Sequence, residues 1–240
     1  MQKNQKDILF AQDVSNMIDA SVLLRDATYQ DVDDLAEACK KYNFVCAFTW
    51  PAYTQLIGEK LRGAGTGFGG AVSYPSGQEP TAIKVVQTEY FLGLGVSEVD
   101  MVMNLGWLKS KRFNEVTADI RSVKKACGAI PLKVIIEAMM LSDEQIVDAC
   151  KCVLDGGADY VKSGTGFCTE PTTLHHVELM KNTVGDRIKL KVAGGVRSLD
   201  TLIRMYKMGT VRFGIGLASA ISIMQDAIAH TDGIDLRKAE

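Results

Sequence analysis

The chain has 240 residues, of which 47% are hydrophobic, and a formal net charge of -2 at pH 7. This length and apolar content can bury a large core, either as one α/β barrel or as two smaller domains. The five prolines are scattered and no polar low-complexity stretch divides the chain, so we expect a single domain over residues 1–240. The nearly neutral, mixed charge argues against nucleic acid as a partner, because nucleic-acid binders carry a basic footprint.

Membrane and secreted classes are not expected either. The sequence has no run of about 18 apolar residues to span a bilayer, and no apolar run of signal-peptide length adjoins residues 1–7. Six cysteines do not suggest a disulfide framework, because a chain with a full core does not need such cross-links. We therefore expect a cytoplasmic protein without a membrane partner. Its cysteines are expected to be small buried hydrophobes: Cys39, Cys46, Cys127, Cys150, Cys152 and Cys168.

Apolar strand-like runs alternate with amphipathic segments along the chain. We predict eight strands, at 17–22, 44–49, 69–74, 97–104, 132–137, 158–163, 188–193 and 210–214. We predict helices between them at 29–42, 80–94, 112–127, 142–155, 171–184 and 198–208. Ser142, with Gln145 three residues later, and Ser198, before Leu199, are typical helix N-caps.

This order of elements favours one α/β architecture over another. Eight βα units in 240 residues predict a (β/α)8 TIM barrel, here with a short N-terminal helical extension. A large doubly wound sheet is the alternative. That fold would usually carry fewer strands and a Gly-rich loop after the first one.

The alternation of residues along the predicted strands shows which charged side chains face the barrel interior. Asp100 lies on the fourth strand, Lys133 and Glu137 on the fifth, Lys162 on the sixth and Lys191 on the seventh. Inward ion pairs sometimes only hold a barrel together. Five such groups near the catalytic ends of the strands instead favour a functional site.

Two of these residues, Lys162 and Lys191, end short strands that follow one another in the chain. A buried lysine is costly unless it is paired or neutral. Neighbouring strands lie about 4.8 Å apart, so the Lys191 ammonium can lower the pKa of Lys162. A neutral amine of this kind can attack a carbonyl carbon.

Glycine-rich loops follow the last predicted strands. Gly194 and Gly195 come directly after the seventh strand, and Gly214 and Gly216 follow the eighth. Backbone N–H groups in these loops of a barrel commonly hold a phosphate. With Arg197 beside one loop, and Thr165 and Gly166 after the sixth strand, the pattern predicts an anion pocket.

Five motifs, in order along the chain, resemble those of the deoxyribose-phosphate aldolase family. They are Glu98–Gly106, Lys133–Glu137, Asp159–Phe167, Lys191–Arg197 and Arg212–Gly214. The resemblance extends from Asp19 in the first strand to the eighth strand. It implies a metal-free class I aldolase without a cofactor, which joins acetaldehyde and glyceraldehyde 3-phosphate reversibly.

The resemblance also implies roles for individual residues. Lys162 matches the Schiff-base lysine, Lys191 the lysine that lowers its pKa, and Asp100 the acid that transfers protons. We expect an aldehyde or sugar phosphate as the ligand, and barrels of this size often form homodimers. The expected substrate-binding residues are Asp19, Lys133, Glu137, Thr165, Gly166, Gly194, Gly195, Arg197, Gly214 and Gly216.

The substrate lining departs from the family pattern. Ile215 and Leu217 occupy the loop in which the family usually has small serines that bind phosphate, and Phe48 stands where a cysteine is common. Losing a charge-assisted hydrogen bond to a phosphate costs about 1.5–3 kcal/mol. Three readings remain. The first is a deoxyribose-phosphate aldolase, the second is a divergent class I aldolase for another substrate, for example an unphosphorylated one, and the third is a non-catalytic barrel.

Overall fold

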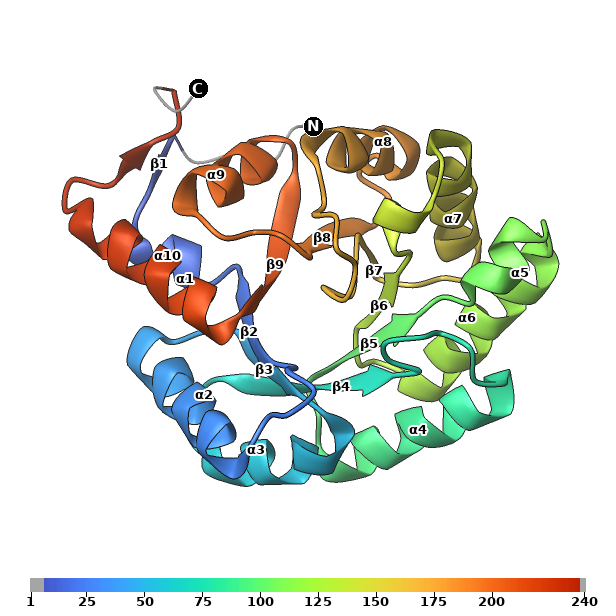
Figure 1. Ribbon diagram of the computed structural model, residues 1–240, viewed down its shortest axis with the longest axis horizontal. Helices are drawn as coiled ribbons and strands as arrows, with labels where there is room; N and C mark the ends of the chain where they lie inside the picture. The colour runs from blue at the N-terminus through green and yellow to red at the C-terminus, as the bar shows by residue number, and fades with distance from the viewer. Residues whose placement is uncertain (1–6, 238–240) are drawn as a thin grey trace.

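The computed structural model describes residues 7–237, and its centre is a closed barrel of eight parallel strands (Figure 1). This confirms the predicted (β/α)8 fold. Strand β2 pairs with both β3 and β9, which closes the barrel. The strands are β2 (Ile18–Val22), β3 (Cys46–Thr49), β4 (Gly67–Val72), β5 (Glu98–Val102), β6 (Leu132–Ile135), β7 (Tyr160–Lys162), β8 (Lys189–Ala193) and β9 (Thr210–Gly216).

Helices surround the barrel (Figure 1). The six predicted helices are confirmed as α2 (Tyr29–Tyr42), α4 (Thr81–Leu94), α6 (Phe113–Cys127), α7 (Asp143–Asp155), α8 (Leu174–Val184) and α9 (Leu199–Lys207). Further helical segments were not predicted, namely α3 (Thr54–Lys60), α5 (Leu105–Lys109), α10 (Leu217–Ala229) and the short η1 (Pro51–Tyr53) and η2 (Ala138–Met140).

Side-chain caps begin several of these helices where the sequence indicated. Ser142 accepts a hydrogen bond from the backbone of Gln145, whose side chain accepts one from the backbone N–H of Ser142. Ser198 accepts from the backbone N–H of Thr201. Each such cap contributes about 1 kcal/mol to helix stability and sets where the preceding loop ends.

The N-terminal extension is the short helix α1 (Ala11–Ser15), as predicted. It is preceded by β1 (Ile8–Leu9), which pairs antiparallel with β10 (Ile234–Asp235). The tail, as far as the structure describes it, is therefore held against the start of the chain. The last three residues lie outside the described part.

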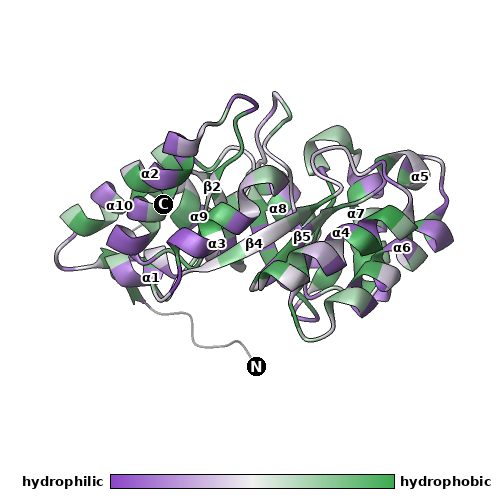
Figure 2. Cartoon of the chain, turned by 90° about the horizontal axis from the view of Figure 1, so that it is seen from below, coloured by the Kyte–Doolittle hydropathy of each residue, from purple (hydrophilic) through white to green (hydrophobic). Residues whose placement is uncertain are grey.

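The hydrophobic core lies between the strands and the surrounding helices. Val99 of β5, Phe91 of α4 and Phe213 of β9 are all buried there. Figure 2 shows hydrophobic and hydrophilic residues on the same helices, as expected of amphipathic helices in an outer layer. Burial of one such aromatic side chain contributes about 1.5–3 kcal/mol. No helix among residues 7–237 is long and apolar enough to cross a bilayer.

One buried lysine lies in this outer layer, away from the barrel interior. The Nζ atom of Lys84 in α4 lies 2.6 Å from Oδ2 of Asp119 in α6 and donates to the carbonyl of Val102 at 3.2 Å. Both side chains are almost fully buried. A buried lysine in this chain can therefore serve structure alone when a carboxylate is in contact with it.

Candidate active site

Lys162 and Lys191 share one carboxylate. Lys162 is the last residue of β7 and pairs in register with Lys191 of β8. Their Nζ atoms each lie 2.7 Å from Oδ2 of Asp100, which is on β5. All three side chains are buried. The structure thus brings together the three residues predicted to be catalytic.

A wider ion network supports this triad from inside the barrel. Lys133 lies 3.3 Å from Oδ1 of Asp100 and 2.6 Å from Glu98. Asp19 lies 2.6 Å from Lys191, and Arg212 is 2.6 Å from Asp19. Glu98 and Arg212 were not predicted, although alternation from Asp100 and Gly214 places both on inward faces.

The charges of this network balance only if one base is neutral. It contains three carboxylates, Asp19, Glu98 and Asp100, and four bases, Lys133, Lys162, Lys191 and Arg212. Uncompensated charge in a buried site is costly, so loss of one proton is favoured. The pKa of Lys162 is lowered, and its loss of a proton leaves three charges of each sign.

Burial is the main cause of this lowered pKa. It lowers the pKa of Lys162 to about 8; the Lys191 ammonium acts in the same direction and the Asp100 carboxylate opposes both. Burial disfavours ionisation of Asp100, but the ammonium groups of Lys162, Lys191 and Lys133 outweigh it and lower the pKa of Asp100. Asp100 therefore stays ionised beside an amine that titrates near neutral pH.

This pKa sets an expected pH profile. The rate of imine formation between the wild-type protein and acetaldehyde should rise with pH and level off above about pH 8, because only the free amine attacks. Below that pH the free fraction falls roughly tenfold per unit. The initial rate of borohydride-trapped adduct, measured across pH, checks this. A midpoint near 10.5, the ordinary lysine value, would contradict it.

A large cavity opens above these residues at the carboxyl ends of the strands. Its volume is about 1210 Å³, and Lys162, Lys191 and Asp100 lie in its lining. No described residue after Gln225 lines it, so the described tail does not cover it. The predicted substrate-binding residues in its lining are Asp19, Thr165, Gly166, Gly194, Gly195, Arg197, Gly214 and Gly216.

The other two predicted binding residues, Lys133 and Glu137, do not line the cavity. Lys133 is fully buried in the ion network. Glu137 follows β6 with a φ of 49°, which breaks the strand alternation used to place it. Its carboxylate accepts hydrogen bonds from the backbone N–H of Thr165 at 2.9 Å and from the Thr165 hydroxyl at 2.5 Å, and so holds the loop after β7.

Glycines form the side of the cavity where an anion was predicted. Gly194 and Gly195 have φ values of 82° and 111°, which glycine adopts at little cost. Gly216 is the N-cap of α10, and no side chain caps that helix. Free backbone N–H groups at a helix start favour an anion. A Cβ at Gly214 would touch Ala193 and crowd Lys191, so glycine keeps the approach to the lysines open.

Ile215 does not have the place in the cavity that the sequence predicted. Ile215 reaches the cavity, but it is 2% exposed and belongs to the hydrophobic core between barrel and helices. Alternation along β9 turns its side chain away from the barrel interior. Ile215 therefore fills the core, and Leu217, which also lines the cavity, remains the departure from the expected serines in this loop.

Aromatic rings form another side of the site. The rings of Trp50, Tyr74 and Phe167 lie 5.7–5.8 Å apart in edge-to-face pairs, and the Arg25 guanidinium lies 5.5 Å from the Phe167 ring. Tyr74 donates to the carbonyl of Thr165 at 2.6 Å, and burial raises the pKa of its hydroxyl. Arg25, Tyr74 and Phe167 line the cavity. This aromatic group was not predicted as part of the site.

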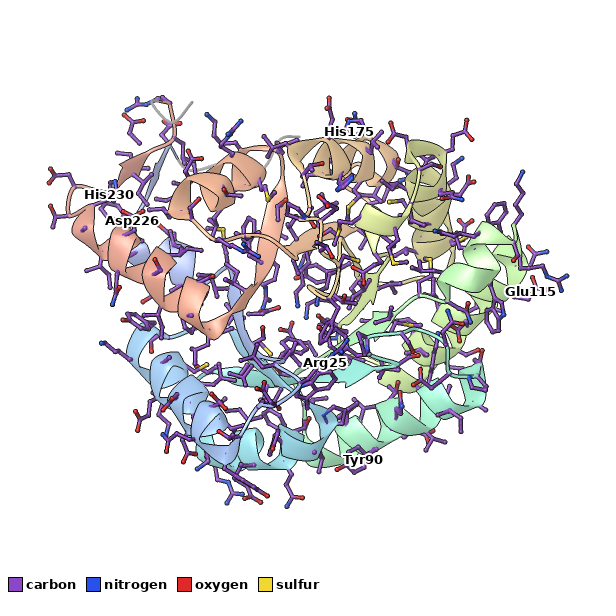
Figure 3. All side chains as sticks on the ribbon, in the orientation of Figure 1. Arg25, Tyr90, Glu115, His175, Asp226 and His230 are labelled. Atoms are coloured by element: carbon purple, nitrogen blue, oxygen red, sulfur yellow. The ribbon has the colours of Figure 1, made fainter. Side chains whose placement is uncertain are left out.

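None of the histidines lines the larger cavity. His175 and His230 are at the edge of the view in Figure 3, whereas Arg25 lies near its centre. His175 contacts Asp143 at 2.9 Å on the surface.

Among the described residues, one set with metal-ligand spacing comprises Asp19, Cys46 and Glu98. Its two carboxylates are engaged by Lys133, Lys191 and Arg212, an arrangement that fits an ion-pair network.

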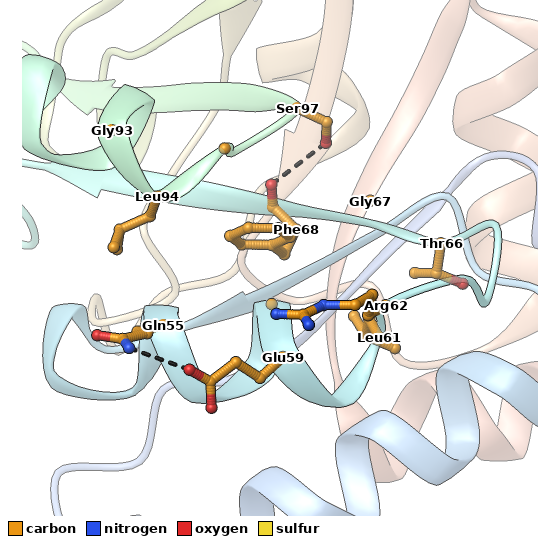
Figure 4. A pocket seen from close by; sticks show the side chains of 12 residues that line it. Gln55, Glu59, Leu61, Arg62, Thr66, Gly67, Phe68, Gly93, Leu94 and Ser97 are labelled. Atoms are coloured by element: carbon orange, nitrogen blue, oxygen red, sulfur yellow. Dashed lines mark hydrogen bonds between the residues drawn. The ribbon is translucent and has the colours of Figure 1, made fainter.

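A second, smaller cavity of about 530 Å³ lies between α3, α4 and the start of β4 (Figure 4). Gln55, Glu59, Arg62 and Phe68 contribute to its lining. It adjoins the amino end of β4, whereas the larger cavity lies at the carboxyl ends of the strands. None of the predicted site residues lines it.

The site geometry agrees with the comparisons with known proteins. A family model described as DeoC/LacD family aldolase matches residues 14–225. The chain belongs to this family. It is therefore an aldolase, a carbon–carbon lyase, as the resemblance implied.

Individual relatives cover nearly the whole chain. A deoxyribose-phosphate aldolase from Carboxydothermus hydrogenoformans is 36% identical over 223 residues, covering 91% of this chain and 97% of the relative. One from Staphylococcus haemolyticus is 37% identical, covering 91% and 98%. The solved deoxyribose phosphate aldolase from Aeropyrum pernix, described as tetrameric, has a TM-score of 0.82 at 27% identity and covers 90% of this chain and 91% of its own.

Proposed function

We propose that this aldolase cleaves 2-deoxyribose 5-phosphate reversibly to acetaldehyde and glyceraldehyde 3-phosphate, with Lys162 as the Schiff-base residue. The observation that carries the proposal is the position of Lys162, buried at the cavity floor with Nζ 2.7 Å from Asp100 and a pKa of about 8. The relatives that bear the name of this activity share more than a third of their residues with the chain.

The first steps follow from the free amine. Neutral Lys162 attacks the C1 aldehyde carbon of the open-chain sugar and forms a carbinolamine. Loss of water then requires a proton on the departing hydroxyl. The Lys191 ammonium can give up this proton, and the Asp100 carboxylate, in contact with both lysines, can relay it. The product is an iminium on Lys162.

The iminium then acts as the electron sink for cleavage. A base removes the proton of the C3 hydroxyl, the C2–C3 bond breaks, and its electron pair moves into the iminium to form an enamine. Glyceraldehyde 3-phosphate leaves with the phosphate. Protonation of the enamine at C2 and hydrolysis release acetaldehyde and return Lys162 as a free amine. Asp100, ionised and shared by both lysines, is placed to move these protons.

The phosphate would lie against the glycine loops. Gly195 and the first residues of α10 line the same cavity as Lys162 and carry backbone N–H groups, and Arg197 is also in its lining. Main-chain donors can bind a phosphate without serine hydroxyls, as helix N-termini do. Leu217 offers no hydroxyl donor to a phosphate, and the main-chain donors at the start of α10 remain available.

The substrate test compares two sugars that differ only in the phosphate. The kcat/KM for 2-deoxyribose 5-phosphate should exceed that for 2-deoxyribose by about 10² or more, since two charge-assisted hydrogen bonds of about 1.5–3 kcal/mol each would be lost. Coupled assays of the released aldehydes measure both. A ratio near one would favour the second candidate, an aldolase for an unphosphorylated acceptor. The aromatic group of Trp50, Tyr74 and Phe167 is the observation that favours that candidate.

We also propose a cytoplasmic homo-oligomer. All six cysteines are free, which fits a reducing compartment, and the solved relative from Aeropyrum pernix is described as tetrameric. Light scattering on the purified protein would give the mass of the assembly, against 26.1 kDa for one chain.

A further inference from the structure

The shared carboxylate does not by itself decide which lysine is neutral. Oδ2 of Asp100 is 2.7 Å from Nζ of Lys162 and 2.7 Å from Nζ of Lys191. If the proposed Schiff-base chemistry holds, only a neutral Lys162 is productive, because a neutral Lys191 would leave the nucleophile protonated. Another feature of the site must therefore make Lys191 keep its proton more readily than Lys162.

The aromatic ring of Phe48 is one such asymmetric feature. The Nζ atom of Lys191 lies over this ring at 4.4 Å from its centroid, whereas that of Lys162 is 5.9 Å away. Phe48 is 4% exposed and lines the cavity, so little water weakens the contact. The negative face of an aromatic ring stabilises a cation, and more strongly at shorter distance and in a dry site.

The chain makes room for this ring in a specific way. Phe48 occupies space beside Gly69 of β4, where any Cβ would overlap the ring. Phe91 packs in the same manner on Gly70, the next residue along the strand. Successive residues of a strand face opposite sides, so Phe48 lies on the lysine side and Phe91 in the outer core.

The other charged groups around the two lysines come from four strands. Asp19 on β2 lies 2.6 Å from Lys191 and favours charge there. Lys133 on β6 lies 3.3 Å from Asp100, while Glu98 on β5 and Arg212 on β9 pair with each other at 3.2 Å. Asp19 and Phe48 thus both favour the charged form of Lys191.

We propose that Phe48 is a positioning residue that holds the shared proton on Lys191 and thereby leaves Lys162 as the free amine. Phe48 forms no bond to the substrate in this role. It acts through the two lysines, by a contact that is closer to one than to the other. The lowered pKa of Lys162 is consistent with this direction.

The test measures the pH dependence of borohydride-trapped imine with acetaldehyde as the probe. In Phe48→Leu, which stays apolar but lacks the aromatic face, Lys162 should keep its proton to higher pH. The midpoint should rise by about one pH unit, and trapping below it should slow about tenfold. Phe91→Leu is the matched control: it removes a ring from the neighbouring glycine of β4, with an expected loss of stability and an unchanged midpoint.

Fluorinated phenylalanines at position 48 separate the ring's electrostatics from its volume. Fluorine withdraws electron density from the ring face and changes the size little, so the midpoint should rise with each added fluorine. The same analogues at position 91 should leave it unchanged. These variants also test the role of the Phe48 ring if Phe48→Leu does not fold.

The outcomes distinguish this inference from the proposed function. Wild-type protein that traps no aldehyde would overturn the Schiff-base chemistry itself. Wild-type trapping with coincident midpoints for wild type, Phe48→Leu and the fluorinated series would leave that chemistry intact and overturn the role of Phe48. A downward shift of the midpoint would overturn it as well.

Discussion

Replacement of Lys162 by methionine should abolish aldol cleavage while the barrel remains folded. Methionine is close to lysine in length and apolar, and the site loses the amine that forms the imine. We expect turnover to fall by about four to six orders of magnitude, the scale observed when a covalent nucleophile is removed. Steady-state rates with 2-deoxyribose 5-phosphate, together with circular dichroism to confirm folding, measure this.

Lys189→Met provides the control. It removes an ammonium from β8, the strand of Lys191, but from its exposed start, where Nζ lies over the Tyr160 ring at 5.3 Å. This variant should keep turnover within about twofold of wild type, as expected for a surface change. Residual cleavage by Lys162→Met at a tenth of the wild-type rate would refute the role of Lys162.

Asp100→Asn should separate imine formation from turnover. Asparagine keeps the side-chain shape but removes the negative charge that three lysines contact. Loss of general acid–base catalysis should lower kcat by about 10²–10⁴. Because Asp100 raises the pKa of Lys162, its removal should also move the midpoint of imine trapping to lower pH. The variant should thus form the imine more readily at acidic pH and turn over more slowly.

The stability of Asp100→Asn should fall as well. Breaking a buried ion pair by removing one partner costs about 3–5 kcal/mol, because the other charge stays buried without compensation. Urea unfolding at pH 7 measures this loss. A variant with a kcat within a factor of three of wild type, at any stability, would exclude Asp100 from proton transfer.

Much of the fold was predictable because its elements have strong local signals. Helix α2 was placed with the correct bounds, since Thr28 caps its start and Asn43 ends it in a left-handed conformation. Helix α10 was missed because its sequence is apolar on most sides and offers no capping side chain. The β1–β10 pair joins two-residue strands more than 200 positions apart, a contact without any local pattern.

The site was predictable to the extent that strand alternation holds. It placed Asp100, Lys162 and Lys191 on inward faces, and the same pattern contains Glu98 and Arg212. It failed at Glu137, because β6 ends at Ile135 and the backbone then turns. Burial of a lysine is a weaker signal than its position, as the Lys84–Asp119 pair outside the barrel shows.

The aromatic features could not be derived from spacing along the chain. Trp50, Tyr74 and Phe167 follow three different strands, and their contacts depend on how the loops after β3, β4 and β7 fold. The place of Phe48 depends likewise on Gly69 in the neighbouring strand. Phe48 departs from the family pattern, and these aromatic contacts are where the substrate preference of the site should be sought.

The most direct test of the central claim is the location of the trapped adduct. The wild-type protein is incubated with acetaldehyde, reduced with borohydride, digested and mapped by mass spectrometry. One ethyl group on Lys162, with Lys191 and the exposed lysines unmodified at low aldehyde concentration, is the predicted result. An adduct confined to Lys191, or none on either lysine, would contradict Lys162 as the Schiff-base residue.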